Sequence, residues 1–331
     1  MLNKAVNSKP SINRLVIIGL GLIGSSLAVA ARELGLAETV VGISRRSSTL
    51  ELALDRGIID QACDSLKAIA NDLDAGDMVV IGVPTLTVPG ILKECHELLS
   101  DCVTITDVAS VKGSVVNAAT NIYGRMPGQF VPGHPIAGSE RSGVTAADSK
   151  LFEHHKVILT PTETTESKHL EAVASLWIGV GAKVASMPVE EHDEILAATS
   201  HLPHFLAYSL VDTLASMEDK REIFRYAAGG FRDFTRIAAS DPVMWRDIAL
   251  ANRASILSTL DHVMDNFTAL RGAIDSGDEQ YLMDVFTRAR DARIHFGKLL
   301  ENKSLQDPMT EKTINYHISP GGHARGVVRV P

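Results

Sequence analysis

The chain has 331 residues, enough for two domains of ordinary size, with the 45% hydrophobic and 22% charged content of a globular protein. Its net charge of −8 excludes a general nucleic-acid-binding surface, which needs an excess of basic residues. The three cysteines lack metal-ligand spacing and are too few for a disulfide framework, so we expect free thiols and a cytoplasmic protein.

The N-terminal region contains one apolar stretch that needs care. Residues 1–11 are polar, and we expect them to be disordered. Leu15–Ala31 follows several basic residues and resembles a secretory signal, but Gly19, Gly21 and Gly24 interrupt it in the pattern of a strand, a tight turn and a helix. We prefer the second interpretation. No other stretch approaches the ~20 apolar residues of a membrane span, so we expect no membrane partner.

Short apolar runs alternate with amphipathic segments between residues 12 and 188. Strands are predicted at Leu15–Gly19, Thr39–Ile43, Met78–Val83, Val103–Asp107, Phe130–Val131 and Val157–Thr160. Helices are predicted at Ser25–Leu34, Ser48–Arg56, Val88–Leu99 and Lys168–Gly179. Continuous apolar strands with helices between them indicate a parallel sheet covered on both faces.

The pattern changes near Val189. Helical periodicity predicts an all-α domain over residues 189–302, with helices at 190–216, 221–239, 242–275 and 278–302. Pro203 lies inside the first of these, so we expect a kink or a break there. Residues 303–331 are expected to be a linker that ends in the start of another strand.

A glycine-rich turn directly follows the first predicted strand. Gly19, Gly21 and Gly24 form a G-x-G-x-x-G whose glycines permit a tight turn, a close approach to a pyrophosphate and close helix packing. The helix N-terminus then presents free N–H groups to the phosphates. We therefore assign residues 12–188 to an α/β Rossmann-type dinucleotide-binding domain. Further candidate cofactor contacts are Leu22, Ile23, Val83 and Pro84.

The end of the second strand bears on the choice of cofactor. An acidic residue there binds the ribose of NAD and repels the 2′-phosphate of NADP. This chain has Ser44, Arg45 and Arg46 instead, and two guanidiniums beside hydroxyls suit a phosphate. We expect NADP to be preferred or at least accepted, with NAD also possible. The alternative is a solvated basic turn.

Two histidine-containing segments are candidates for chemistry. His134 lies in a glycine-bounded loop, and a neutral imidazole can accept a proton near neutral pH. At helical spacing, Asp193, Ser200, His201 and His204 share one face of an otherwise apolar segment. Structural histidines remain an alternative for both segments. Metal binding by His201 and His204 is another alternative, but no third ligand is evident, so we expect no metal.

Five motifs in order resemble the prephenate, arogenate and cyclohexadienyl dehydrogenase family of tyrosine biosynthesis. These are the glycine turn, Asp107–Lys112, Gly133–Glu140, Ser200–His204 and Gly229–Arg236. The resemblance implies an NAD(P)-dependent oxidative decarboxylation, in which hydride goes to the nicotinamide and loss of CO2 makes the ring aromatic. It does not distinguish prephenate from arogenate as the substrate.

The resemblance also implies roles for individual residues. His134 matches the proton-accepting histidine, and Ser110 matches the serine that contacts the same substrate hydroxyl. Arg236 matches an arginine that binds a substrate carboxylate. His201 and His204 match a pair that lines the substrate pocket. Ser139, in the same motif as His134, is a further candidate for substrate binding.

The resemblance implies two further features. The helical domain is expected to form a homodimer, as it does in the family. Ala324–Pro331 resembles the first strand of 5-enolpyruvylshikimate-3-phosphate synthase, which implies a fused second enzyme after a linker at 303–322. Two alternatives stay open for the whole chain: another NADP-dependent dehydrogenase, such as a β-hydroxyacid dehydrogenase, and a nucleotide-binding redox sensor that performs no chemistry.

Overall fold

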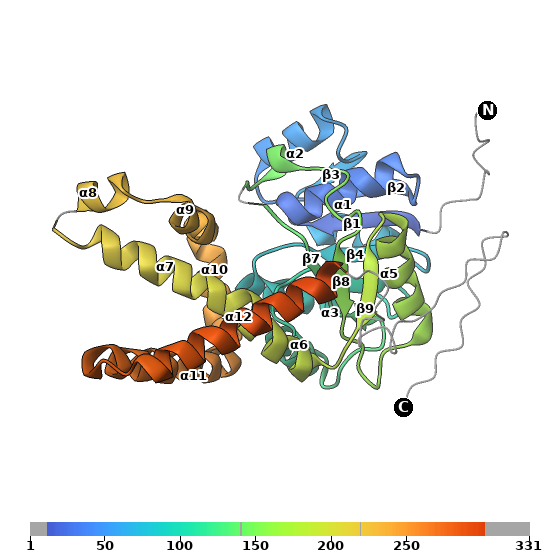
Figure 1. Ribbon diagram of the computed structural model, residues 1–331. Coiled ribbons are helices and arrows are strands. Elements are labelled where there is room, and N and C mark those ends of the chain that lie inside the picture. The colour runs from blue at the N-terminus through green and yellow to red at the C-terminus, as the bar shows by residue number, and fades with distance from the viewer. Residues whose placement is uncertain (1–11, 140, 219, 302–331) are drawn as a thin grey trace, which may run out of the picture.

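The structure is a computed structural model that describes residues 12–139, 141–218 and 220–301 (Figure 1). The predicted N-terminal disorder over residues 1–11 and the predicted linker and fused strand over 303–331 lie outside these residues. In the described part of the chain, no helix has both the length and the apolar character needed to span a membrane.

The N-terminal half is built on a six-stranded parallel sheet with the order β3-β2-β1-β4-β5-β6. Its strands are β1 (Ile12–Ile18), β2 (Ala37–Ile43), β3 (Gln61–Cys63), β4 (Met78–Ile81), β5 (Thr104–Asp107) and β6 (Phe130–Val131). The associated helices are α1 (Leu22–Glu33), α2 (Ser47–Asp55), α3 (Val88–Leu98), α4 (Gly113–Tyr123) and α5 (Ser167–Gly179). Short 3-10 turns are η1 (Leu66–Ala68), η2 (Ala70–Asp72), η3 (Thr85–Thr87) and η4 (Val144–Ala146).

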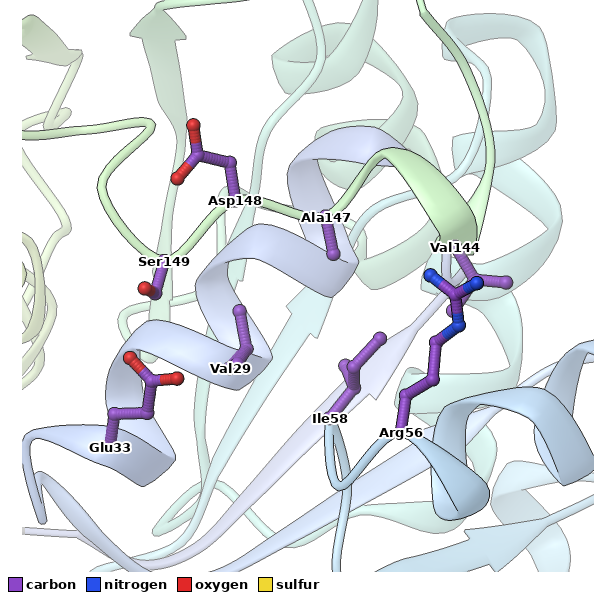
Figure 2. Close-up of a pocket in the computed structure, with 8 residues that line it drawn as sticks. All are labelled: Val29, Glu33, Arg56, Ile58, Val144, Ala147, Asp148 and Ser149. Atoms are coloured by element: carbon purple, nitrogen blue, oxygen red, sulfur yellow. The ribbon is translucent and has the colours of Figure 1, made fainter.

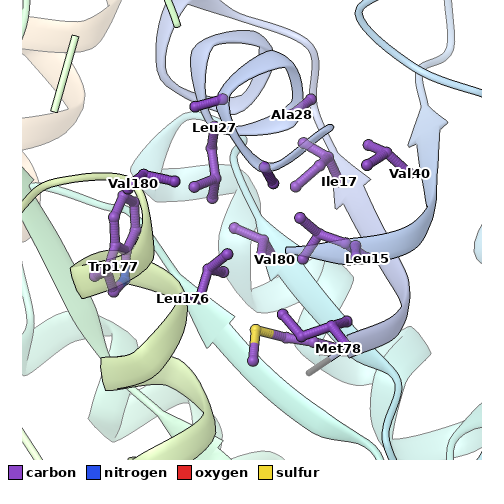
Figure 3. Packing of buried hydrophobic residues seen from close by; sticks show 14 of the residues in the cluster. Leu15, Ile17, Leu27, Ala28, Val40, Met78, Val80, Leu176, Trp177 and Val180 are labelled. Atoms are coloured by element: carbon purple, nitrogen blue, oxygen red, sulfur yellow. The ribbon is translucent and has the colours of Figure 1, made fainter. Parts of the chain in front are cut away.

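Both faces of this sheet are buried, because alternate residues of a strand point to opposite faces. Leu15 and Ile17 of β1 pack in one cluster, which α1 and α5 cover. Figure 3 shows Trp177 of α5 among these residues. Val16 and Ile18 pack in the opposite cluster with residues of α3 and α4. The predicted α/β fold with a parallel sheet is therefore confirmed.

One predicted strand belongs to a different sheet. A second, three-stranded sheet has the order β7 (Gly133–Ile136), β8 (Lys156–Leu159) and β9 (Lys183–Ser186). The run predicted at 157–160 is β8, which pairs antiparallel with β7 and parallel with β9. Placing it in the parallel sheet was wrong, because an apolar run does not reveal its partner or direction. The pattern also missed β3, β7, β9 and α4, which are short or of mixed polarity.

The C-terminal half is helical. It contains α6 (Val189–Leu196), α7 (Leu202–Ala215), α8 (Lys220–Arg225), α9 (Gly229–Thr235), η6 (Arg236–Ala239), α10 (Pro242–Ala251), α11 (Arg253–Ser276) and α12 (Glu279–Glu301). The segments predicted at 221–239 and 242–275 are each divided into shorter helices. In Figure 1, α7 and α11 extend away from the sheets. We keep residue 188 as the proposed boundary between the two halves.

The predicted interruption near Pro203 is present. A π-helical turn, η5 (Ala197–His201), joins α6 to α7, and Pro203 lies in the first turn of α7. Proline lacks the N–H that would bond to the preceding turn, so the regular hydrogen-bond pattern cannot run through this point. The interruption falls on the segment that carries His201.

Candidate active site

The glycine turn has the geometry that a dinucleotide requires. Gly19 has φ +101°, and a Cβ atom there would lie 2.6 Å from the Gly82 carbonyl oxygen. A Cβ atom on Gly24 would lie 2.2 Å from the Gly19 carbonyl oxygen, so α1 packs directly on the turn. Gly21, by contrast, faces open space at the N-terminus of α1. These positions fit a pyrophosphate that approaches Gly21 and the N–H groups of α1.

The other predicted cofactor residues lie at the same edge of the parallel sheet. Leu22 and Ile23 begin α1, and Val83 and Pro84 follow β4, which neighbours β1. Ser44 follows β2, and its hydroxyl accepts a hydrogen bond of 3.2 Å from the Arg46 backbone N–H. The side chains of Arg45 and Arg46 are exposed. Two guanidiniums therefore lie in solvent beside the end of β2.

His134 lies on strand β7 rather than in the predicted loop, and it is buried. Its Nδ1 atom is 2.9 Å from Nε2 of His192 on α6. The His192 Nδ1 atom is in turn 2.8 Å from a carboxylate oxygen of Asp193. His134 is thus the end of a line of three buried side chains that starts in the helical half of the chain.

The segment that carries Ser110 is held from both halves of the protein. Val111 is fully buried in a cluster with Trp245 and Ile248 of α10. Lys112 is also fully buried, and its ammonium group donates to the Asp107 carboxylate and to the Gly133 carbonyl oxygen. Lys112 therefore ties the end of β5 to the residue before His134.

The tautomer of His201 can be read from its neighbour Asn252. The Asn252 amide nitrogen lies 2.8 Å from the Asp193 carbonyl oxygen, so this group is a donor, and it also lies 3.3 Å from Nδ1 of His201. Nδ1 must accept this bond, which places the single proton of a neutral His201 on Nε2. Among the described residues, the buried Nε2 has no hydrogen-bond partner. A neutral His201 therefore carries a buried N–H group that no described residue accepts.

His204 and Trp245 lie beside His201. Their rings stack with centroids 3.7 Å apart, and His204 Nδ1 donates a hydrogen bond of 2.9 Å to the Ser200 carbonyl oxygen. The Trp245 ring also makes an edge contact with His201. The predicted pairing of His201 and His204 on one side of a helix is present, and Trp245 links them.

Two further predicted substrate residues lie at the surface of the described part of the chain. Arg236 is exposed at the start of η6, which packs against α7. Ser139 is exposed, and its hydroxyl accepts a hydrogen bond of 3.3 Å from the Arg141 backbone N–H. Their roles in substrate binding stay predictions.

Burial keeps the histidines of the site neutral. It lowers the pKa of His134 well below its ordinary value, and His192, Lys112 and His201 lower it further. Burial also lowers the pKa of His201, to about 4. Burial alone would raise the pKa of Asp193, but hydrogen bonds from His192 and from two backbone N–H groups lower it overall. The site therefore combines uncharged imidazoles with the ionised carboxylate of Asp193.

His192, Lys112 and Asn252 were missed from the sequence. Lys112 lies in a motif that was recognised, but nothing in the sequence shows that its charge is buried. His192 precedes Asp193, which was already assigned to the polar face, so the adjacent pair was the available signal. Asn252 follows the apolar α10 and carries no motif of its own.

A separate cavity of about 330 Å³ lies on the outer side of α1 (Figure 2). Its lining includes Glu33, Arg56 and Asp148 and none of the histidines described above. Within the described residues, no group of three or more histidine, cysteine or acidic side chains is arranged to hold a metal ion.

Two family models match the chain. One, described as the nucleotide-binding domain of prephenate dehydrogenase, matches residues 27–186, and the other, described as its dimerization domain, matches residues 188–288. The chain belongs to the prephenate dehydrogenase family. The family and the class of enzyme predicted from the sequence are confirmed, and the chain is an oxidoreductase of this family.

Two curated proteins are similar to this chain over most of its length and most of their own. The cyclohexadienyl dehydrogenase of Zymomonas mobilis is 36% identical over 283 residues, which cover 85% of this chain and 94% of that protein. The prephenate dehydrogenase of Bacillus subtilis is 37% identical over 283 residues, which cover 84% of this chain and 75% of that protein.

Solved structures of the family have the same fold. The prephenate dehydrogenase of A. aeolicus, determined in complex with hydroxyphenyl propionate and NAD+, is 38% identical. It superposes with a TM-score of 0.80 over 87% of this chain and 100% of that chain. The arogenate dehydrogenase of Synechocystis is 28% identical, with a TM-score of 0.71 over 86% of this chain and 99% of that chain. Nothing in these comparisons supports the predicted fused synthase.

Because His201 is buried and neutral, we predict that the free energy of unfolding depends on pH. The folded-state pKa of about 4 lies below the ordinary 6.5, so between these values the unfolded chain binds a proton that the folded chain does not. The free energy of unfolding should fall as the pH falls through this range. His201→Gln should reduce this loss, as measured by urea unfolding at a series of pH values. His155→Gln, at an exposed histidine just before β8, should have the wild-type pH dependence; an equal reduction in both variants would contradict the prediction.

Proposed function

We propose that this enzyme oxidises prephenate to 4-hydroxyphenylpyruvate and CO2 with a nicotinamide dinucleotide, and that arogenate is a second substrate. The observation that carries the proposal is the neutral, buried His134 in a chain of this family, with the Ser110 segment joined to the residue before His134 by the hydrogen bond from Lys112 to Gly133. Arogenate is included because one relative is named a cyclohexadienyl dehydrogenase and a similar structure an arogenate dehydrogenase.

His134 takes the proton of the substrate ring hydroxyl through Nε2, and Ser110 orients that hydroxyl. A bound nicotinamide supplies the acceptor for the hydride that leaves the same carbon. The bond from the ring to its carboxylate then breaks, CO2 leaves, and the electron pair makes the ring aromatic. The new phenolate oxygen takes the proton back from His134, so no net proton is released.

The remaining site residues bind and orient the substrate. The His201 Nε2–H group donates to a substrate oxygen, and a partner there would satisfy an otherwise unpaired buried donor. His204 and Trp245 form an aromatic wall for the ring. Arg236 binds a substrate carboxylate, for which a planar guanidinium is suited, and Ser139 adds a hydroxyl contact.

NADP is the proposed preferred cofactor, with NAD also accepted. Gly19, Gly21 and Gly24 hold the pyrophosphate, and Arg45 and Arg46 pair with the 2′-phosphate. The exposure of both arginines beside β2 supports this assignment. The NAD+ in the A. aeolicus complex supports a nicotinamide dinucleotide in general but not the phosphorylated form.

The active form is a proposed homodimer joined through the helical half. The family model of this half is described as a dimerization domain. Large apolar side chains on α11 and α12 are exposed in the single chain: Met264, Phe267, Ile274, Met283, Phe286, Ile294 and Phe296. A second copy would cover apolar surface that a monomer leaves in water. We propose a cytoplasmic location from the three free cysteines.

The proposed reaction is tested by adding prephenate and NAD or NADP and following the absorbance of the reduced nicotinamide together with CO2 release. The wild-type protein should form both products in equal amounts. His134→Asn should lower kcat by about 10²–10⁴ with little change in KM, because the proton acceptor is lost and binding is not. A protein that turns over neither prephenate nor arogenate would contradict the proposed reaction, and a His134→Asn variant with wild-type kcat would contradict the role of His134.

The cofactor proposal predicts a selective effect of charge at the end of β2. Replacing both Arg45 and Arg46 by glutamine should raise KM for NADP by roughly 10- to 100-fold, as expected for lost charge-assisted hydrogen bonds. KM for NAD should change less than about twofold. Arg56→Gln, an equivalent charge loss at the far end of α2, should affect neither constant. A wild-type kcat/KM about ten times higher for NAD than for NADP would contradict the proposal.

A further inference from the structure

Asp193 stands at the start of a directed line of hydrogen bonds that ends on His134. One carboxylate oxygen lies 2.8 Å from Nδ1 of His192, and Nε2 of His192 lies 2.9 Å from Nδ1 of His134. Asp193 and His192 lie on α6, whereas His134 lies on β7 in the other half of the chain. His192 is fully buried and His134 nearly so, with 8% of its surface exposed.

The direction of each hydrogen bond follows from the first. An ionised carboxylate can only accept, so Nδ1 of His192 carries a hydrogen. A neutral His192 then has a bare Nε2, which must accept from His134. His134 Nδ1 therefore carries the hydrogen, and Nε2 of His134 is left with a lone pair. Burial lowers the pKa of both histidines, which keeps each imidazole neutral, with the single ring hydrogen that this series of hydrogen bonds requires.

We propose that His192 and Asp193 are positioning residues that fix the tautomer of His134, so that its Nε2 faces the substrate as the proton acceptor. The proposal rests on the proposed role of His134 in proton transfer. In the opposite tautomer Nε2 would carry a hydrogen and could not take the substrate proton. A carboxylate has this effect on the catalytic histidine of serine proteases, where it acts directly rather than through a second imidazole.

The same carboxylate also holds the segment that carries Ser110. The Asp193 oxygens accept hydrogen bonds of 2.9 Å and 2.8 Å from the backbone N–H groups of Lys112 and Gly113, at the start of α4. A Cβ atom on residue 113 would lie 2.8 Å from the second oxygen, so glycine leaves the space that the carboxylate fills. Asp193 thus fixes the segment two residues from Ser110 while it fixes the tautomer of His134.

Asn252 fixes Asp193 from the other side. Its amide donates to the Asp193 carbonyl oxygen and to Nδ1 of His201. His201 therefore presents an N–H donor, and His134 presents a bare nitrogen. The two imidazoles that the family resemblance assigns to the site are held in opposite tautomers by neighbours that meet at Asp193. One can stabilise a substrate oxygen while the other accepts a proton.

Two replacements of His192 separate control of the tautomer from simple anchoring. Glutamine reaches the position of the His192 Nε2 atom, so its carbonyl oxygen can accept from His134. Asparagine reaches only the position of Nδ1, so it can donate to Asp193 but cannot contact His134. His192→Gln should lose less than about threefold in kcat, whereas His192→Asn should lose about 10- to 100-fold with little change in KM. If anchoring to Asp193 were the only role, the asparagine variant would be the more active one, and that result would overturn the proposal.

The tautomer itself is measured on the whole protein without substrate. Long-range nitrogen–proton NMR of protein containing nitrogen-15 histidine distinguishes a protonated ring nitrogen from a bare one, and the His134 signals are assigned by their loss in His134→Asn. We expect His134 to carry its hydrogen on Nδ1 in the wild type and in His192→Gln, and a mixture of tautomers in His192→Asn. A wild-type His134 with its hydrogen on Nε2 would overturn the proposal even if prephenate is turned over. A wild-type protein in which His134 has the expected tautomer but prephenate is not turned over would instead contradict only the proposed function.

Discussion

The buried carboxylate of Asp193 is the constraint on which the rest of the site depends. It accepts from the first N–H groups of α4 in the nucleotide-binding half, although Asp193 itself belongs to the helical half. These N–H groups have no partner within their own helix, and a negative charge at a helix N-terminus is favourable. Removing the carboxylate would leave several buried donors unpaired, each of which costs free energy. The Asp193 side chain therefore accepts the unpaired N–H groups at the start of α4 and also orients His192.

The charges around Asp193 explain why the site holds neutral histidines. Lys112 is paired with Asp107 in the interior, and its charge opposes protonation of both His134 and His192. Asp193 favours protonation of His192, but burial outweighs that attraction. The result is a set of imidazoles that are ready to accept or donate single hydrogen bonds. A substrate with two carboxylates would add negative charge and so favour the imidazolium that forms on His134 during proton transfer.

The sequence predicted the nucleotide-binding fold and the family well, because glycine spacing and apolar runs are local signals. A Cβ atom would clash at Gly19 and Gly24, whereas Gly21 faces open space, as the spacing of the three glycines implied. The contact of His134 with His192 spans 58 positions of the chain, and it exists because β7 leaves the parallel sheet and pairs antiparallel with β8. A run of apolar residues does not encode that pairing. The predicted polar face placed Asp193 beside His201, but the Asp193 carboxylate turns to α4, and His201 is the last residue of the π-helical turn that follows α6. The roles predicted for Ser139 and Arg236 are contacts with a bound substrate, so they do not follow from the sequence pattern or from the fold of the chain alone.

The central claim is that His192 acts on catalysis through His134. A double-mutant cycle on kcat with prephenate tests this directly, using His134→Asn, His192→Asn and the variant that carries both changes. If His192 only fixes the tautomer of His134, the double variant should be no slower than His134→Asn alone, because there is no longer a tautomer to fix. A double variant that loses the product of the two single effects would contradict the account, since His192 would then act independently of His134.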